Sequence, residues 1–127
     1  MPLIRIDLPK GKSPAYRKAV SAGVHRALTE TFNVPEDDLF QIVTEHGEGT
    51  GLIHTSSYMG VRYTGDLVFI QLTVSDTRTL HQKRQLFSRI VDLLAKNPGL
   101  RREDVFINLV EVKKENWSFG NGEAQYA

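Results

Sequence analysis

Apolar and polar positions along the chain follow the same order twice. Residues 3–8, LIRIDL, alternate apolar with polar side chains, which is typical of a strand with one buried face. Residues 13–32 place their apolar side chains on one helical face, and residues 39–45, LFQIVTE, return to a strand pattern. The second half repeats this order, with strands at 67–74 and 105–112 and a helix at 79–97. The pattern therefore predicts a strand, a helix and a strand in each half.

Residues at the boundaries support these elements. Ser13 is a helix N-cap residue, and Pro14 fits the first helical position, where a backbone N–H has no partner in any case. Pro35 blocks continuation of the first helix, and the sequence NPG at 97–99 ends the second. Residues 67–74, LVFIQLTV, are almost continuously apolar, which predicts a central strand that is buried on both faces.

A shift of 66 residues superposes one half of the chain on the other. The segment VPEDDLFQIVTE at 34–45 then lies over LRREDVFINLVE at 100–111, and Asp38 falls on Asp104. The same shift matches strand to strand and helix face to helix face. One constant offset across several elements indicates a structural duplication.

The duplicated pattern predicts the architecture. A helix between two strands of one sheet forms a parallel strand–helix–strand unit. Two such units predict a two-layer α/β fold, with a four-stranded sheet and both helices on one face. The other sheet face would be broad, apolar and uncovered, which predicts an oligomer whose bare faces pack around an axis. We expect one domain over 1–127, repeat halves at about 2–48 and 67–113, a loop with at most a short turn at 46–66, and a pocket or interface segment at 114–127.

Composition narrows the class of protein. Basic and acidic residues nearly balance, 16 against 15, so nucleic acid is not an expected partner. Cysteine is absent, which excludes disulfides and thiolate chemistry and fits a reducing, cytoplasmic location. The N-terminus lacks a signal-peptide pattern, and no apolar stretch approaches the ~18 residues of a membrane span. The four histidines lack metal-ligand spacing, so no metal site is expected.

Pro2 directly follows Met1 and precedes the first strand. Proline is tolerated at the first residue of a strand, which is one interpretation. The other is chemical, because removal of Met1 leaves Pro2 with a free secondary amine. Such an amine is a general base when neutral and an acid when protonated. The duplicated strand has Val68 at the equivalent position, so the fold itself does not require proline there.

Four segments carry a resemblance to a known family: MPLIRIDL, VPEDDLFQIVTEH, Arg78-Thr79 at the second helix start, and NWSFGNGEAQY near the C-terminus. Together with the duplication, they make the chain resemble the tautomerase superfamily, and within it most closely the malonate semialdehyde decarboxylase family. The resemblance implies a homotrimer of two-layer subunits and excision of Met1. It also implies that Pro2 is the central catalytic group and that no cofactor takes part.

The resemblance assigns roles to Asp38 and Arg78. Asp38 would hold Pro2 protonated, or position a water molecule or the substrate carbonyl. The alternative is a turn residue, since Asp104 at the duplicated position is expected to be structural. Arg78 would bind a substrate carboxylate through the N–H donors of its planar guanidinium group. The alternative is a surface arginine, although a cation at the start of a helix interacts unfavourably with the helix dipole. Some relatives carry a further arginine where this chain has Asp76.

Trp117 and Phe119 are expected to form an apolar wall of the substrate pocket. Such a wall favours loss of CO₂, because the charge is more dispersed in the transition state than in the carboxylate. The alternative for both rings is ordinary packing in the core or between subunits. Gln125 and Tyr126 are expected to close the pocket.

These features favour a cofactor-independent enzyme that acts on a small oxo acid, with decarboxylation of the malonate semialdehyde type as the first interpretation. The second is a keto–enol tautomerase acting on phenylpyruvate-like or 2-hydroxydienoate substrates, and the third a hydratase acting on an acetylenic or haloacrylic acid. The non-enzymatic alternative is a trimeric binding protein. A Pro2 amine that is mainly charged at pH 7 favours the decarboxylase, and a mainly neutral one favours the tautomerase.

Overall fold

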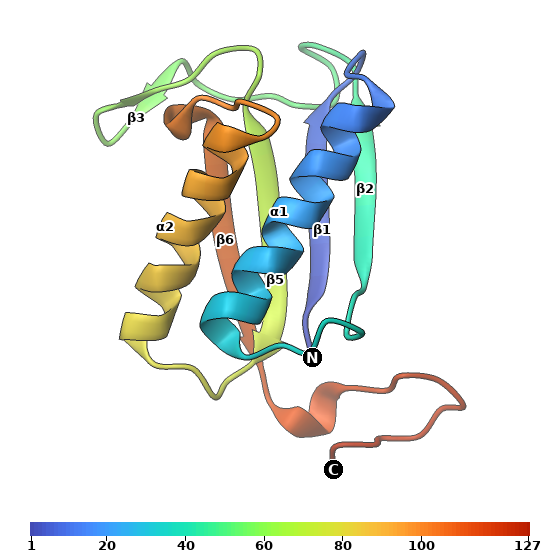
Figure 1. Ribbon diagram of the computed structural model, residues 1–127. Coiled ribbons are helices and arrows are strands. Elements are labelled where there is room, and N and C mark those ends of the chain that lie inside the picture. The colour runs from blue at the N-terminus through green and yellow to red at the C-terminus, as the bar shows by residue number, and fades with distance from the viewer.

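Two layers make up the fold, a four-stranded sheet and two helices that lie side by side on one of its faces (Figure 1). The computed structural model describes residues 1–127. The strands are β1 (Leu3–Pro9), β2 (Gln41–His46), β3 (Ser57–Tyr58), β4 (Val61–Arg62), β5 (Val68–Ser75) and β6 (Val105–Val112). The helices are α1 (Pro14–Phe32) and α2 (Leu80–Lys96), with short 3₁₀ turns η1 (Arg102–Asp104) and η2 (Lys114–Asn116).

The main sheet has the strand order β2-β1-β5-β6. β1 pairs with β2 in parallel, and β5 pairs with β6 in parallel. The two halves meet where β1 and β5 run antiparallel, with Leu3 opposite Thr73 and Asp7 opposite Phe69. A strand, a helix and a strand from each half therefore build one mixed sheet, which confirms the predicted fold class.

The hydrophobic core lies between the sheet and the two helices. Alternate side chains of β1, namely Ile4, Ile6 and Leu8, are fully buried, as the period of two predicted. The predicted helix faces supply the other side of the core, and their buried residues are Val20, Val24, Ala27, Leu28, Leu86, Ile90, Leu93 and Leu94. Burial of apolar surface is the main favourable contribution to folding. The duplicated apolar positions thus converge on one core.

The helices α1 and α2 approach closely at Gly23. A Cβ atom at this position would lie 2.8 Å from Leu94 Cδ2 and 3.7 Å from Leu93 Cβ. Glycine costs a helix roughly 1 kcal/mol relative to alanine, so helix propensity does not explain its presence. The absence of a side chain leaves room for Leu94 and lets both helices cover the sheet in one layer.

Capping contacts set the helix boundaries. Ser13 Oγ accepts a hydrogen bond from a backbone N–H of the first turn of α1, and Pro14 occupies that turn, as predicted. Asn33 ends α1 in the left-handed conformation, with φ of 55°. Thr79 and Gln82 form a reciprocal capping box at the start of α2. Neither helix is long and apolar enough to cross a membrane.

Residues 46–66 contain more structure than the expected loop. Glu48 and Leu52 form an isolated bridge, and β3 and β4 form a two-stranded hairpin. Met59 and Gly60 join the two strands, and both have positive φ, which is the geometry of a tight hairpin turn. The sequence pattern missed this hairpin because methionine is not typical of a left-handed turn position.

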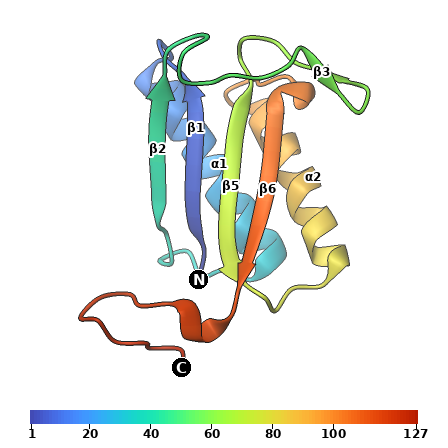
Figure 2. The same cartoon turned by 180° about the vertical axis from the view of Figure 1, so that it is seen from behind.

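The sheet face opposite the helices is uncovered in the single chain (Figure 2). Gln71 of the central strand β5 is exposed on this face, so the expected burial of that strand on both faces is not met within one chain. The face is also less apolar than expected. Exposed rings such as Phe106 stand beside hydrogen-bonded polar pairs, Asp7 with His46 and Gln71 with Asn108.

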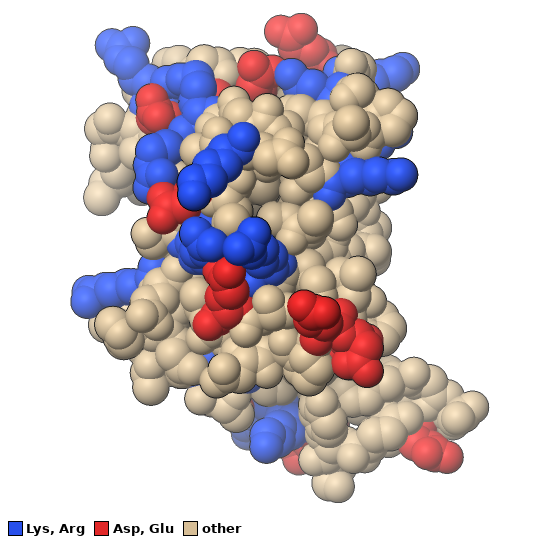
Figure 3. All heavy atoms as spheres, viewed as in Figure 1, with Lys and Arg blue, Asp and Glu red and all other residues tan.

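Acidic and basic side chains are intermingled on the face that the helices cover (Figure 3). Glu30 of α1 pairs with Arg89 of α2, and Asp92 pairs with Arg102. Exposed pairs of this kind individually contribute little to stability. They leave no extended field of one sign on this face, in keeping with the formal net charge of +1.

Candidate active site

The N-terminus, the end of β5 and the C-terminal tail meet at one end of the sheet (Figure 1). Together they line a pocket of about 560 Å³. The lining residues are Met1, Ser75, Thr77, Arg78, Lys114, Gln125 and Tyr126. The pocket thus brings together three of the residues expected near substrate, Arg78, Gln125 and Tyr126, with the residue that precedes Pro2.

Pro2 is buried at the start of β1, with Met1 ahead of it in the pocket. The α-amino nitrogen of Met1 lies 3.8 Å from Asp38 Oδ2. The other carboxylate oxygen, Oδ1, is buried and has no hydrogen-bond partner. A hydrogen bond of 3.0 Å from Asp38 N–H to Pro35 O holds the turn that carries this side chain. Asp38 therefore reaches the chain terminus with one oxygen uncommitted.

The surroundings of the α-amino group shift its protonation. Burial lowers the pKa of the Met1 amine from its ordinary value, and the charge of Arg78 acts in the same direction. Asp38 raises this pKa through its negative charge, but the net shift is downward. An amine at this position is therefore easier to deprotonate than one in free solution.

Arg78 is held by neutral groups from the end of α1 and from the connection between β5 and α2. Its Nη2 donates to Phe32 O at 2.7 Å, and its Nη1 donates to Thr77 Oγ1 at 2.8 Å. The guanidinium carbon also lies 5.0 Å from the centre of the Phe32 ring. Phe32 is the last residue of α1, so the negative end of that helix dipole stabilises the cation. This contact offsets the unfavourable position of Arg78 near the start of α2.

The charge of Arg78 has no acidic partner among the ion pairs of the chain. Asp76, two residues earlier, is exposed and does not pair with it. The backbone N–H of Asp76 instead donates to Val112 O at 3.0 Å. The guanidinium is therefore available to an anion that enters the pocket.

Trp117 and Phe119 do not line the pocket, but each contacts a residue that does. Trp117 Nε1 donates to Ser75 Oγ at 3.1 Å, and the indole stacks on the Phe119 ring with centres 5.6 Å apart. Phe119 in turn packs edge-on against Tyr126 at 4.8 Å. Ser75 and Tyr126 are the members of this group that reach the pocket. The two predicted wall residues thus contact the pocket lining without being part of it.

Sequence reasoning missed Ser75, Thr77 and Lys114 as pocket residues. Lys114 brings a second cation without an acidic partner to the lining. A signal for Lys114 was present, because β5 and β6 are parallel and residues that follow them emerge at the same end of the sheet. Ser75 and Thr77 carry no comparable signal, since small hydroxyl residues are common next to turns and helix starts.

The two duplicated aspartates have different surroundings. Asp104 is fully buried and accepts hydrogen bonds from Thr64 N–H at 2.8 Å and from Arg101 Nη1 at 3.2 Å. The hydroxyl of Thr64 donates to the same carboxylate. Asp104 therefore ties the segment after the hairpin to the start of β6, which is the structural role expected for it. Asp38 has no such partners.

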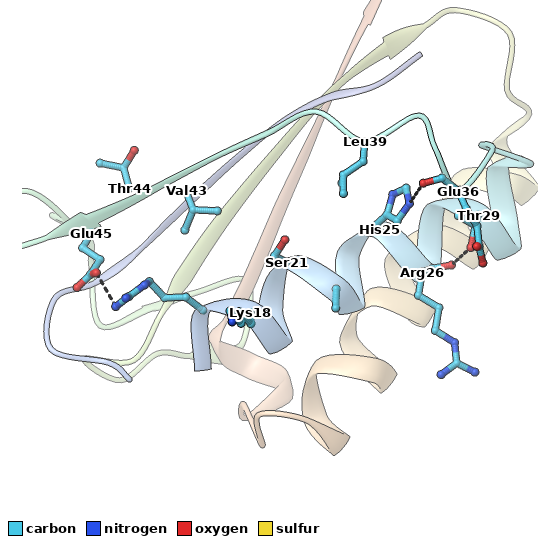
Figure 4. Close-up of a pocket in the computed structure, with 12 residues that line it drawn as sticks. Lys18, Ser21, His25, Arg26, Thr29, Glu36, Leu39, Val43, Thr44 and Glu45 are labelled. Atoms are coloured by element: carbon cyan, nitrogen blue, oxygen red, sulfur yellow. Dashed lines mark hydrogen bonds and ion pairs between the residues drawn. The ribbon is translucent and has the colours of Figure 1, made fainter. Parts of the chain in front are cut away.

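The largest groove of the molecule lies elsewhere, between α1 and β2, and measures about 860 Å³ (Figure 4). Several of its polar side chains already have partners within the chain, because Arg17 pairs with Glu45 at 2.7 Å and His25 Nε2 contacts the backbone oxygen of Glu36 at 2.9 Å. Figure 4 shows these side chains spread along the groove rather than aimed at one point. None of the predicted site residues lines this groove, so the pocket at the N-terminus is the candidate active site.

Family models and a curated relative agree on the class of protein. A tautomerase enzyme model matches residues 38–120, and a second tautomerase enzyme model matches residues 2–57. The probable tautomerase YusQ of Bacillus subtilis (strain 168) is 38% identical over 125 residues, which cover 98% of each chain. The chain therefore belongs to the tautomerase superfamily of enzymes.

Solved structures agree with this assignment. FG41 malonate semialdehyde decarboxylase inhibited by 3-bromopropiolate matches with a TM-score of 0.90 and 37% identity, over 98% of this chain and 93% of that one. A fused 4-OT described as a wild type symmetric trimer shares the fold at a TM-score of 0.76 and 17% identity, over 98% of this chain and 97% of that one. The first match confirms the resemblance found in the sequence, and the second confirms the fold.

Proposed function

We propose that the chain, after removal of Met1, is a cofactor-independent decarboxylase of a small oxo acid of the malonate semialdehyde type. One observation carries this proposal. Met1 at the chain terminus and Arg78, whose guanidinium has no acidic partner, line one pocket, and the terminal amine lies 3.8 Å from Asp38, whose other carboxylate oxygen has no hydrogen-bond partner. The similarity to a malonate semialdehyde decarboxylase supports the type of reaction.

Arg78 binds the substrate carboxylate in this proposal. Phe32 O and Thr77 Oγ1 accept hydrogen bonds from two of its N–H groups and fix the position of the guanidinium group. The remaining donors are free to form a bidentate pair with an anion. Lys114, the second unpaired cation of the lining, adds to the positive potential that attracts the substrate.

The free amine of Pro2 acts on the substrate carbonyl group. When protonated, with Asp38 favouring the charged form, it donates a hydrogen bond to the carbonyl oxygen and withdraws electron density from it. The bond between the carboxylate carbon and its neighbour then breaks, CO₂ leaves, and the carbonyl oxygen takes the proton of the Pro2 amine, so that the electron pair is held as an enol. Protonation of the enol at carbon gives the aldehyde product.

A keto–enol tautomerase is the second candidate, and one observation favours it. The pKa of the Met1 amine is lowered by burial and by Arg78, and an amine of Pro2 in the same surroundings would be favoured in its neutral form, which is a general base. Pro2 would then carry a proton between oxygen and carbon of a phenylpyruvate-like or 2-hydroxydienoate substrate. The name of the relative YusQ, probable tautomerase, supports this candidate. A hydratase and a non-catalytic trimeric binding protein are the remaining alternatives.

We infer that the working form is a homotrimer. The uncovered sheet face carries exposed rings beside hydrogen-bonded polar pairs, a combination that suits an interface between subunits. A fused 4-OT with the same fold is a symmetric trimer, which supports this assembly. The expected ligand of each subunit is a small carboxylate.

Assays with two substrates separate the candidate reactions. CO₂ release from malonate semialdehyde supports the decarboxylase, and ketonisation of phenylpyruvate enol supports the tautomerase.

Pro2→Ala should lower kcat by about 10²-fold or more, because a primary amine replaces the cyclic secondary amine. Arg78→Gln should mainly raise KM, and Ser88→Ala, on the exposed face of α2, is the matched control. Turnover of neither substrate, or full activity of Pro2→Ala, contradicts the proposal.

A further inference from the structure

We propose that Ser75 is a positioning residue that anchors the aromatic strap, by which we mean Trp117, Phe119 and Tyr126, to the sheet beside the pocket. The consequence for catalysis rests on the proposed function. The anchoring itself does not, because it concerns the free enzyme. Ser75 is 4% exposed at the end of β5, so its hydroxyl occupies a defined place in the interior.

The backbone around Ser75 fixes the position of its hydroxyl group. Ser75 pairs with Val112 in the last register of the β5–β6 ladder. The next residue, Asp76, extends the pairing by donating its N–H to Val112 O at 3.0 Å. Ser75 Oγ then accepts the indole N–H of Trp117 at 3.1 Å. A rigid sheet end therefore holds the acceptor, and the tail supplies the donor.

This bond is the only hydrogen bond that joins residues 117–127 to the sheet. The other hydrogen bonds of these residues are local: Trp117 N–H to Lys114 O, Phe119 N–H to the Gln125 side chain, and the Gln125 amide to Gly120 O. Two further bonds join neighbouring turns within 120–127. Gln125 thus closes the tail on itself, while Ser75 alone ties it to the strands by a hydrogen bond.

The three rings of the aromatic strap are in contact one after another, from Trp117 to Tyr126 at the pocket. The Trp117 and Phe119 rings are nearly parallel, at 23°, and Phe119 meets Tyr126 edge-on, at 75°. Tyr126 lines the pocket with Arg78 and with Ser75 itself. Aromatic pairs of this kind have preferred geometries, so a change in the Trp117 orientation is passed along the stack. Loss of the Ser75 hydroxyl should therefore displace Tyr126 from the substrate site.

Trp117 is the only tryptophan of the chain, so its fluorescence reports the anchor directly. Ser75→Ala should shift the emission to longer wavelength and raise acrylamide quenching by about twofold or more, as the indole becomes more exposed. Ser75→Thr keeps a hydroxyl at the same atom position and should restore the wild-type spectrum. Ser88→Ala removes an exposed hydroxyl on α2 and should leave the spectrum unchanged.

Steady-state kinetics test the link to substrate binding. Ser75→Ala should raise KM for the oxo acid by about tenfold with a smaller change in kcat. Trp117→Phe keeps an aromatic ring, lacks the indole N–H, and should raise KM by a similar factor. Because both changes remove the same hydrogen bond, the double variant should be no worse than either single one.

The outcomes separate the anchor from the proposed function. An unchanged emission spectrum and unchanged quenching in Ser75→Ala overturn the anchor, whatever the activity. A shifted spectrum with an unchanged KM, or independent effects of the two variants on KM, overturns the positioning role. If the wild type turns over neither substrate, the proposed function fails while the fluorescence still decides the anchor. If Ser75→Ala does not fold, Ser75→Thr and Trp117→Phe are compared with the wild type instead. The positioning role is then overturned if Ser75→Thr has an altered KM, or if Trp117→Phe has the KM of the wild type.

Discussion

Asp38 and Asp104 occupy equivalent positions of the duplicated halves but have opposite surroundings. Asp104 is buried and accepts hydrogen bonds from Thr64 and Arg101. Asp38 has a buried oxygen with no partner, close to the N-terminal amine. A buried acceptor without a partner lowers the stability of the fold. Its presence at Asp38 therefore points to a chemical role, whereas Asp104 maintains the structure.

Substituting each aspartate by asparagine separates these roles. Asp104→Asn replaces an accepting oxygen by a donor, so the free energy of unfolding should fall by about 2 kcal/mol. Asp38→Asn should change it by less than about 0.5 kcal/mol while lowering kcat/KM by about 10²-fold. Urea unfolding and kinetics on the same samples measure both quantities. A loss of stability at Asp38 as large as that at Asp104 would show that Asp38 is structural.

The pKa of the N-terminal amine should respond in opposite directions to its two charged neighbours. Asp38 raises the pKa of the Met1 amine and Arg78 lowers it. Asp38→Asn should therefore move this pKa further down, and Arg78→Gln should move it up. The pH dependence of acylation by an amine-reactive reagent measures it in chains that retain Met1. The same pKa in the wild type and both variants would exclude an electrostatic link among these groups.

Among the elements, α1 carries a polar group that the fold does not satisfy. The hydroxyl of Tyr16 is buried and has no hydrogen-bond partner. Burial, with the charges of Asp66 and Asp104, raises the pKa of Tyr16 to about 12. The folded state thus holds the phenol proton more tightly than the unfolded chain, where tyrosine titrates near pH ~10. This contribution to stability is complete below that pH and is lost as the pH rises through about 12.

Tyr16→Phe tests this account of α1. At pH 7 the free energy of unfolding should stay the same or rise by up to about 1 kcal/mol, because an unpartnered hydroxyl is removed. Above pH ~10 the wild type should lose stability more steeply than the variant. Thermal melts from pH 7 to 11 measure the difference, with Tyr58→Phe in the exposed hairpin as the control. Parallel pH profiles for Tyr16→Phe and the wild type would contradict the stated pKa shift.

For the whole molecule, we propose that the uncovered sheet face forms the interface between subunits. Phe106 on this face is 42% exposed, and its ring centre lies 5.1 Å from that of Phe69. In a trimer built around this face, Phe106→Glu would bring three like charges into a desolvated interface. Light scattering on samples eluted from a size-exclusion column should give the mass of three chains for the wild type and the mass of one chain for Phe106→Glu. Arg84→Glu, on the exposed side of α2, should remain trimeric, and a monomeric wild type would contradict the assembly.

The sequence predicted those parts of the molecule that depend on local periodicity. The core positions of both helices and of β1 followed from repeats of 3.6 and two residues, and the duplication reinforced each of them. The contacts of Arg78 with Phe32 O and of Trp117 with Ser75 could not be predicted in this way. They join residues 46 and 42 positions apart, and their pairing depends on how the tail and α1 pack.

In the proposed mechanism, the free amine of Pro2 performs the reaction. Its most direct test compares two preparations of the same chain, one beginning at Pro2 and one keeping a single residue ahead of it, each verified by intact mass. Only the first has a free secondary amine, because in the second the nitrogen belongs to an amide. We expect turnover of the oxo acid by the first preparation and a kcat lower by at least about 10³-fold in the second. Equal turnover by both preparations would contradict it.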